Sequence, residues 1–537
     1  MAGIPHHALP GYLKRFMEHG LKVAICEQMS EPGKGLVDRE VVRVVTPGTL
    51  VESDLLEPSE NNYLAAVHAW RGTLGLAYID VTTGEFAVTE FGGPDGLSAL
   101  ESEITRLAPS ECLAPDTGLE DRPSIKCTDV DAYLFDPEAG RHRLCKQLGV
   151  RSLEGFGCDE LPAAIGAAGA VLTYIERTNK TALSLLRGLR TYRAEAFMVL
   201  DRYTRSNLEL TESTRSGGKR GTLVSILDST RTAMGGRLLR RWIGQPLLDI
   251  PSLELRHDAV EELYELAVTR TQLRAELAGI ADLERLTGRV CQSIASPENL
   301  LTLSASLRAA GALTALLSDS RSQELVRVRN ACDPCADVSE LIERAVRDPQ
   351  SGSTGKQRRT GGPAAEGYIR AGYSGELDGM RSSIRDSRQW IANLEPAEQE
   401  RTGIRSLKVG YNKVFGFYLE ISNANREPVP EEYLRKQTLV NAERFVTPEL
   451  KEHEARILQA EERISALERR IFSEVLETLA GQSTLLFATA HAVGQLDVYQ
   501  SMAEVARRRR YVRPAMHDDG RLEIVEGRHP VVEATLQ

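Results

Sequence analysis

The sequence predicts a multidomain protein that begins with α/β structure and continues as mostly α structure, with long helical arms that carry a small β-rich module. Its 537 residues correspond to about three to five domains. Aromatic residues make up only 5% of the chain, and low aromatic content beside abundant Leu, Ala, Glu and Arg favours helix over all-β architecture. Along the chain, the spacing of apolar residues changes from the alternation of strands to the period of helices.

Composition and charge exclude several classes of protein. The hydrophobic share of 42% is ample for packed cores and excludes wholesale disorder. The sequence has no run of about 18 apolar residues, which excludes a membrane-spanning helix. The formal net charge of −10 argues against a simple basic coat for nucleic acid, although a local patch can still bind phosphate. Scattered cysteines without a dense framework indicate free thiols in a cytosolic protein.

The first 190 residues are predicted to form two α/β segments. In the first, a helix covers residues 11–19 and short strands cover 23–26 and 41–45, before a turn at 46–49. The second segment shows strands followed by helices, which is an α/β order. Its strands and helices are expected at residues 63–67, 74–79, 85–91, 97–107 and 163–175.

From about residue 195 to residue 400 the apolar spacing is helical almost throughout. Residues 348–363 interrupt it with a polar, glycine-rich sequence that is typical of a disordered loop. Cys332 and Cys335 form a CxxC pair within this part. Because a zinc site needs a second ligand pair and none is nearby, two helix-end thiols are the favoured interpretation.

Residues 376–480 are predicted to form an arm with a module at its tip. A helix over about 376–398 leads into alternating apolar residues at 407–421, with a tight turn at Asn412 and Lys413. A second helix is expected to begin after Thr447, because Thr is a good N-cap and Pro448 fits the first helical position. Apolar residues then recur every seven positions, at Leu450, Ile457, Ile464 and Ile471. This pattern indicates a coiled-coil-like seam on a helix about 50 Å long.

The module at the tip is locally basic. Residues 405–444 carry a net charge of +2, in a chain of net charge −10. A positive excess on a projecting tip suits contact with the backbone of a polyanion. Mixed charges are also the normal state of a solvated surface, so an ordinary charged surface remains the alternative. The basic residues are Arg405, Lys408, Lys413, Arg426, Arg435, Lys436 and Arg444.

Two motifs suggest enzymatic chemistry, and neither is favoured. Asp80 ends a β run, as an aspartate does in nucleases of the RNase H type, but two-metal chemistry needs further carboxylates. Glu85 follows the turn, so a turn-capping Asp80 is the favoured interpretation, with a metal-dependent nuclease as an alternative. The stretch Gly352-Ser-Thr-Gly-Lys356 lacks the spacing of a phosphate loop, and the sequence has no GxxxxGK[ST] motif elsewhere.

Several stretches, in order along nearly the whole chain, closely resemble the MutS family of DNA mismatch repair proteins. They include REVVRVVTPGT (39–49), LAYIDVTTGEF (76–86), DRYTRSNLEL (201–210), MGGRLLR (234–240), LKVGYN (407–412), RKQTLVNAERF (435–445) and EGRHPVV (526–532).

The resemblance implies a domain order. It implies the end of a mismatch-binding domain (1–52), an RNase H-like connector (55–190), the first part of a helical lever core (191–400), a clamp (401–446), the second part of the core (447–510) and the start of an ATPase domain (511–537). The pair Val531 and Val532 looks like a strand, and both ends of the chain look like cuts through a domain. We expect the mismatch-reading Phe-x-Glu element and the ATP site to lie outside this chain, and we interpret residues 350–363 as an insertion.

The resemblance also implies a function in DNA mismatch repair, as part of an ATP-dependent sensor that binds mismatched DNA. The clamp residues expected to contact duplex DNA are Lys408, Asn412, Lys413, Arg435, Lys436 and Arg444. No catalytic residue, cofactor site or metal site is expected in this chain, whereas the intact protein would use ATP and Mg²⁺.

The resemblance further implies a homodimer, a MutL-type repair partner, and a cytoplasmic, nucleoid-associated location without a membrane. A helical scaffold with no role in nucleic-acid binding is a third alternative, beside the repair protein and the nuclease.

Overall fold

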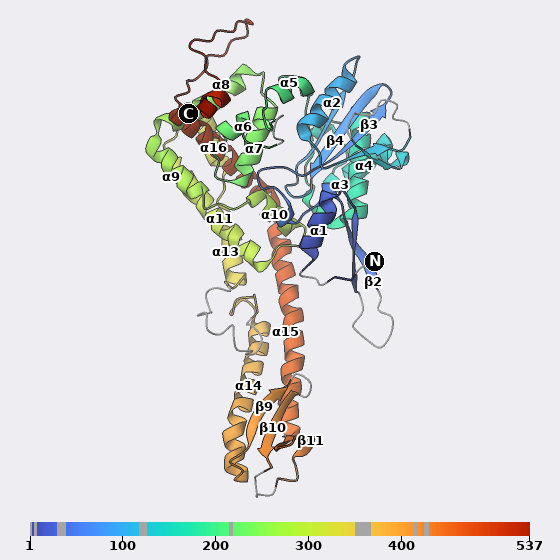
Figure 1. Ribbon diagram of the computed structural model, residues 1–537, viewed down its shortest axis with the longest axis vertical. Helices are drawn as coiled ribbons and strands as arrows, with labels where there is room; N and C mark the ends of the chain where they lie inside the picture. Colours follow the sequence, from blue (N-terminus) through green and yellow to red (C-terminus); the bar gives the residue numbers. More distant parts are fainter. Residues whose placement is uncertain are drawn as a thin grey trace. The chain divides into compact units, whose positions relative to one another are not determined.

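A computed structural model describes residues 3–4, 8–28, 39–117, 126–213, 218–348, 367–412, 416–423 and 429–536. The chain divides into two compact units (Figure 1). The first unit contains Met1–Glu340 and Leu476–Gln537, and the second contains Leu341–Val475. The expected loop and insertion at 348–363 lie almost entirely outside the described residues.

The first unit contains a six-stranded mixed sheet. Its three longest strands, β3, β4 and β5, form an antiparallel meander and confirm the strands predicted at 63–91. Parallel strands extend the sheet at both edges, and the sequence did not predict these. In spatial order the strands are β7 (Thr128–Val130), β6 (Glu111–Pro115), β3 (Tyr63–Trp70), β4 (Thr73–Asp80), β5 (Phe86–Phe91) and β8 (Arg190–Thr191).

Helices cover both faces of this sheet. Alternate residues of β3 and β4 point to opposite faces, so that Leu64 and Ile79 enter one core and Ala65 and Tyr78 enter the other. The first core is closed by α4, and the second by α2. The helices of this layer are α2 (Gly96–Leu107), α3 (Pro137–Leu148) and α4 (Pro162–Thr178). Both predicted helices, at 97–107 and 163–175, are therefore confirmed.

Glycine allows α4 to lie directly on the sheet. A Cβ atom on Gly75 of β4 would overlap the backbone of Ala163 at the start of α4. A Cβ on Gly169 would lie 2.6 Å from the Cα of Gly140 in α3. The close approach of α4 to β4 and to α3 is thus possible only because glycine has no Cβ atom.

The N-terminal segment is a small α/β piece, as predicted. It consists of α1 (Leu9–Glu18) and an antiparallel pair, β1 (Val23–Gln28) and β2 (Arg39–Val45). Its core is formed by Leu13, Val45 and Leu50.

Helices form the rest of the first unit, with α13 continuing into the second. They are α5 (Arg202–Asn207), α6 (Leu223–Leu227), α7 (Ala233–Gly244), α8 (Ile250–Glu265), α9 (Ala267–Leu277), α10 (Leu283–Cys291), α11 (Pro297–Leu316), α12 (Gln323–Ala331), α13 (Ala336–Ala345), α16 (Ser483–Arg509) and α17 (Pro530–Leu536). Many begin after a side chain that accepts a hydrogen bond from the first turn, which is a strong helix-start signal. These N-caps are Asp201, Thr222, Thr232, Asp249, Asp282, Ser296 and Ser322.

The buried α16 holds the start of α7 through Asp497, whose side chain is fully buried. The Asp497 carboxylate accepts hydrogen bonds from the backbone N–H groups of Arg231 (2.9 Å) and Thr232 (2.7 Å) and from the Thr232 hydroxyl (2.7 Å). A Cβ on Gly235 would overlap this carboxylate. Gly235, three residues after the N-cap Thr232, is therefore required for α7 and α16 to pack this closely.

The two C-terminal valines and the two cysteines of the CxxC pair lie in or next to helices. The strand-like interpretation of Val531 and Val532 was wrong, because both lie in α17. Pro530 favours a first helical position, and the His529 ring nitrogen accepts a hydrogen bond from the Val532 N–H. Cys332 follows the end of α12 and Cys335 precedes α13, which confirms the two helix-end thiols. None of the helices in the described ranges has the length and apolar character that a membrane crossing requires.

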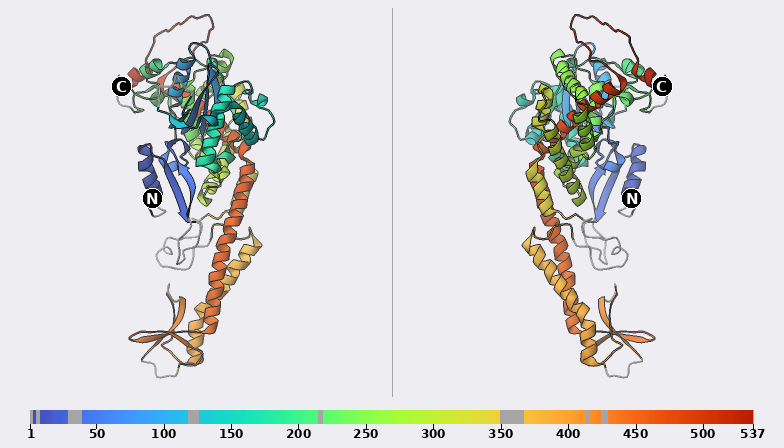
Figure 2. Two further views of the ribbon diagram at one scale, coloured as in Figure 1. Left: turned by 90° about the vertical axis from the view of Figure 1, so that its right-hand side faces the viewer. Right: turned by 90° about the vertical axis from the view of Figure 1, so that its left-hand side faces the viewer.

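The second unit is built on two long helices, α14 (Gly375–Thr402) and α15 (Pro448–Gly481). The Thr447 hydroxyl accepts a hydrogen bond from the Leu450 N–H at 3.1 Å, which confirms the predicted N-cap. Leu450, Ile457 and Ile464 pack toward α14, as the seven-residue repeat predicts. Both views of Figure 2 show the two helices side by side, α14 in yellow-orange and α15 in red-orange.

We predict that Gly75→Ala lowers the stability of the first unit. The new methyl group would force α4 away from β4, and overpacking of this kind costs about 1–3 kcal/mol. Urea unfolding followed by circular dichroism measures the change. Gly92→Ala is the matched control, because nothing lies within 4 Å of its Cβ position. Equal stability of the two variants would contradict the proposed close packing.

Candidate nucleic-acid interface

The second unit carries a four-stranded antiparallel sheet with one buried face. Its spatial order is β11-β12-β10-β9. On β10 and β12, Leu419, Ile421 and Phe445 are buried in a core shared with α14 and α15. Because side chains alternate along a strand, their neighbours must point to the other face. The strands are β9 (Lys408–Asn412), β10 (Gly416–Ser422), β11 (Leu434–Thr438) and β12 (Ala442–Val446).

A polar row crosses the outer face. The strand register places Lys408 opposite Glu420, Glu420 opposite Arg444, and Arg444 opposite Gln437. The Arg444 Nε donates to Glu420 at 2.9 Å, and its Nη1 donates to Gln437 at 3.1 Å. The guanidinium of Arg444 therefore has its partners within the sheet, and its hydrogen bonds connect β12 to β10 and β11.

An aromatic ring supports this row. The Tyr418 ring lies across β9, where a Cβ on Gly410 would come within 2.6 Å of it. The Arg444 guanidinium lies over the same ring, 4.2 Å from its centre. Such a cation–π contact adds to the ion pair with Glu420. Arg444 is thus held on the outer face by Glu420, Gln437 and the Tyr418 ring.

The two edge strands carry exposed lysines. Lys408 on β9 and Lys436 on β11 are exposed, and neither has an ion-pair partner among the residues that the structure describes. Arg435, which precedes Lys436 on β11, is exposed but forms an ion pair with Glu443 at 2.9 Å. A β-bulge at residues 435–437 locally shifts the register of β11.

The six residues predicted to contact DNA differ in their positions and in their partners. Lys408, Lys436, Arg435 and Arg444 come together on one sheet, the first two as free cations and the other two in ion pairs. Asn412 is half-buried at the end of β9, opposite Gly416. Lys413, the second residue of the predicted turn, lies outside the described residues, as does Arg426.

Sequence reasoning missed Gly410, Tyr418 and the strands β11 and β12. A glycine inside a strand often marks a close approach by another group, so Gly410 could have signalled the ring that crosses it. The segment 434–438 has a single apolar residue and carries no comparable signal.

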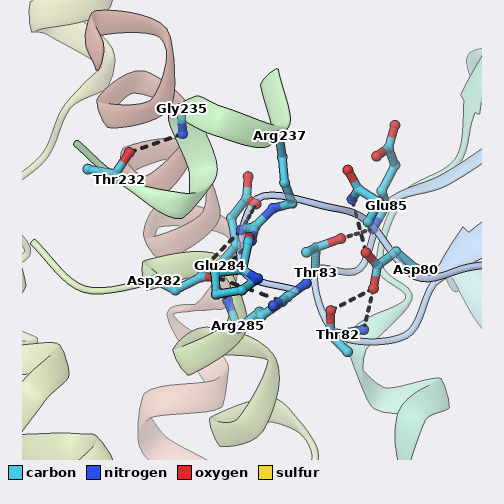
Figure 3. A network of polar contacts seen from close by, with 12 residues as sticks. Asp80, Thr82, Thr83, Glu85, Thr232, Gly235, Arg237, Asp282, Glu284 and Arg285 are labelled. Atoms are coloured by element: carbon cyan, nitrogen blue, oxygen red, sulfur yellow. Dashed lines mark hydrogen bonds and ion pairs between the residues drawn. The ribbon is translucent and has the colours of Figure 1, made fainter. Parts of the chain in front are cut away.

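Asp80, in the first unit, has no capacity left for a metal ion. Its two oxygens accept hydrogen bonds from the Thr82 N–H (2.9 Å) and hydroxyl (2.6 Å), the Asn61 amide (2.9 Å) and the Asn62 N–H (3.1 Å). An ionised carboxylate offers about four such positions. Figure 3 shows Thr82 turned toward this carboxylate. The predicted turn-capping role of Asp80 is confirmed, and the nuclease alternative gains no support.

Buried ion pairs connect the loops of the six-stranded sheet to the helices. The Arg237 side chain on α7 is only 2% exposed and donates to Asp282 (two bonds of 2.8 Å) and Glu284 (2.7 Å). It also donates to the Pro58 carbonyl, which precedes β3. Figure 3 shows Arg237 reaching the two acids from a neighbouring helix. Such a buried charge is tolerated because both terminal nitrogen atoms of the guanidinium have acidic or carbonyl partners, whereas its Nε has none among the described atoms.

Glu85 makes the second connection. Its carboxylate lies 3.2 Å from Arg241 of α7 and 3.5 Å from Arg190, and it accepts the Tyr63 hydroxyl at 2.9 Å. Burial raises the pKa of Glu85, but the two arginines and the Tyr63 hydrogen bond outweigh burial and lower the pKa overall. Burial likewise opposes ionisation of Asp282, whose pKa is lowered by Arg237.

Together these features define a multidomain α/β protein with a small antiparallel sheet packed on two long helices. Comparison with known protein families agrees with this order of parts. Residues 1–54 match MutS domain I, residues 62–187 match MutS domain II, and residues 203–503 match MutS domain III. The chain belongs to the MutS family.

Several curated relatives align with the whole chain. The DNA mismatch repair protein MutS of Symbiobacterium thermophilum is 45% identical over 554 residues. The proteins of the same name from Dehalococcoides mccartyi (strain CBDB1) and Desulfitobacterium hafniense are 43% and 44% identical. Each alignment covers 100% of this chain but only 60–62% of the relative. The chain thus spans about three fifths of the length of these relatives.

We predict that Glu85→Gln destabilises the first unit at neutral pH by about 1–3 kcal/mol, because it leaves the half-buried Arg241 without its anion. The folded-state pKa of Glu85 is below its unfolded value, so its stabilisation is present above the unfolded pKa and disappears as pH falls through the folded pKa. The difference from wild type should therefore shrink as the pH is lowered from neutral to below the ordinary pKa range of a glutamate. Urea unfolding at several pH values measures this difference.

Glu160→Gln is the control, because it removes an exposed carboxylate. A Glu85→Gln difference that stays constant across this pH range would contradict the assignment.

Proposed function

We propose that this chain acts in DNA mismatch repair and binds duplex DNA through the β9–β12 sheet. The observation that carries the proposal is that Lys408 and Lys436, on the two edge strands of this sheet, are exposed and have no acidic partner among the described residues. The relatives are named DNA mismatch repair protein MutS, and this name supplies the biological context.

The spacing of these lysines suits a duplex. Three strand spacings separate β9 from β11, which corresponds to roughly 14 Å. The major groove of B-DNA is about 12 Å wide, so cations at this separation can contact phosphates on both sides of a groove. The aligned Tyr418, Glu420 and Arg444 would keep the surface between them flat. Such contacts position DNA and carry no base information.

The domain roles follow from this proposal. We assign residues 401–446 to the clamp, and residues 191–400 and 447–510 to the lever core. The sheet and helices within 55–190 suit an RNase H-like connector, since an antiparallel meander is followed by parallel strands. Residues 1–52 would belong to the mismatch-binding domain, and residues 511–537 to the start of the ATPase domain.

The whole protein would act as a cytoplasmic, nucleoid-associated homodimer with a MutL-type partner, using ATP and Mg²⁺. The described residues contain neither a metal-binding cluster nor a phosphate-loop motif for those two ligands. No group of three or more His, Cys, Asp or Glu within the described ranges is placed to hold a metal ion. The sequence also has no phosphate-loop motif. No step of DNA binding by the sheet passes through either ligand.

We predict that the double variant Lys408→Glu/Lys436→Glu weakens binding to a matched duplex and reduces its salt dependence. Each lost phosphate contact lowers the slope of log K against log salt by about 0.9, so the double variant should lose up to about 1.8. Fluorescence anisotropy with a labelled duplex, at several salt concentrations, measures both quantities.

Lys146→Glu on α3 is the matched control, with the same type of charge change on an exposed residue. An unchanged affinity and slope in the double variant, or an equal loss in the control, would remove the sheet from the proposal. Absence of any duplex binding by the wild-type chain at low salt would favour the helical scaffold instead.

A further inference from the structure

A cleft of about 450 Å³ lies in the first unit, where the six-stranded sheet meets the helices. It is lined by the end of α2, by α5, by α7 and by the loop at residues 59–61. Figure 1 shows α5 between α2 and α7. The cleft therefore lies between segments that match MutS domains II and III.

The lining is unusually rich in arginine. It contains six arginines and only two carboxylates, those of Glu60 and Glu212. The arginines are Arg106, Arg202, Arg205, Arg237, Arg240 and Arg241.

Three of these arginines are neutralised from outside the cleft. Glu103 pairs with Arg106 at 2.8 Å, and the acids described above pair with Arg237 and Arg241. None of these acids lines the cleft.

The other three arginines carry charge that is poorly compensated. Arg205 donates to the carbonyls of Leu200 (2.9 Å) and Gly244 (2.8 Å) and has no carboxylate partner in the described part of the chain. Arg202 is exposed on α5. Arg240 is 3.6 Å from Glu60, and Lys219 competes for that carboxylate at 3.0 Å. Burial and the neighbouring charge of Arg106 lower the pKa of Arg205, and the carboxylate of Glu103 only partly offsets them.

Three donors of the lining arginines also lack acceptors. The Nε atoms of Arg237, Arg240 and Arg241 are buried and have no hydrogen-bond partner among the atoms that the structure describes. Buried donors of this kind are nearly always satisfied in folded proteins. The side chains of Arg240 and Arg241 are 15% and 29% exposed, so a ligand with several oxygen atoms would supply negative charge and acceptors to the exposed ends of these guanidinium groups.

We propose that this cleft binds a small phosphorylated anion with two or more phosphate groups. Planar guanidinium groups match phosphate oxygens in pairs. The volume lies within the roughly 300–1,000 Å³ of small-molecule sites, and it exceeds what a single phosphate fills. Such a ligand would bridge Arg106 of the sheet layer and Arg205 and Arg240 of the helical part, and so would tie the two parts together.

Isothermal titration at constant ionic strength tests this site, with inorganic tripolyphosphate and a nucleoside triphosphate as separate probes. We expect saturable binding with one site per chain. Tighter binding of the nucleoside triphosphate would identify a nucleotide, and equal affinities would identify recognition of the phosphates alone. Absence of saturable binding of both probes to the wild-type chain would overturn the proposal.

The double variant Arg202→Gln/Arg240→Gln removes two guanidinium groups and retains Arg205, whose carbonyl contacts stabilise the fold. We expect at least about tenfold weaker binding. Arg151→Gln, an exposed arginine outside the cleft, should bind like wild type. Lys408→Glu/Lys436→Glu should also retain the affinity, which separates this site from the proposed DNA contact. Equal affinity of the arginine double variant and Arg151→Gln would overturn the proposal, provided that circular dichroism shows both to be folded.

Discussion

Burial of one face of the β9–β12 sheet against α14 and α15 is the constraint on which the candidate interface depends. Leu419 and Phe445 enter the core, so the alternation of strands forces Glu420 and Arg444 outward. A shift of register by one residue would bury the charges and expose the apolar side chains. The hydrophobic core thus determines where the polar row lies, and the row in turn determines which cations are left for a ligand.

The charged residues of the chain divide into two groups by their partners. Arg237 and Arg444 are held by acids and organise the surrounding structure. Lys408 and Lys436 have no such partners in the described residues, so their charges are available to a polyanion. This division explains how a chain of net charge −10 can present a basic surface. Local pairing, and not the total charge, decides which side chains can contact phosphate.

Sequence reasoning predicted the elements whose signals are local. The strands β3 to β5 alternate clearly, and α15 begins where Thr447 and Pro448 indicate. Sequence reasoning failed for elements and contacts that depend on partners distant in the sequence. The edge strand β11 is mostly polar and is defined by its pairing with β12, while the pairing of Arg444 with Glu420 depends on strand register. Two of the six predicted contact residues, Lys408 and Lys436, are exposed without an acidic partner in the described ranges.

Lysine acetylation footprinting tests the central claim most directly, since it reports which lysines a bound duplex covers. The chain would be treated with an acetylating reagent at low salt, with and without a matched duplex, and each site quantified by mass spectrometry. The account predicts that DNA protects Lys408 and Lys436, whereas Lys146 reacts equally in both samples. Protection confined to other lysines, or no protection of Lys408 and Lys436 under conditions in which the duplex is bound, would contradict it.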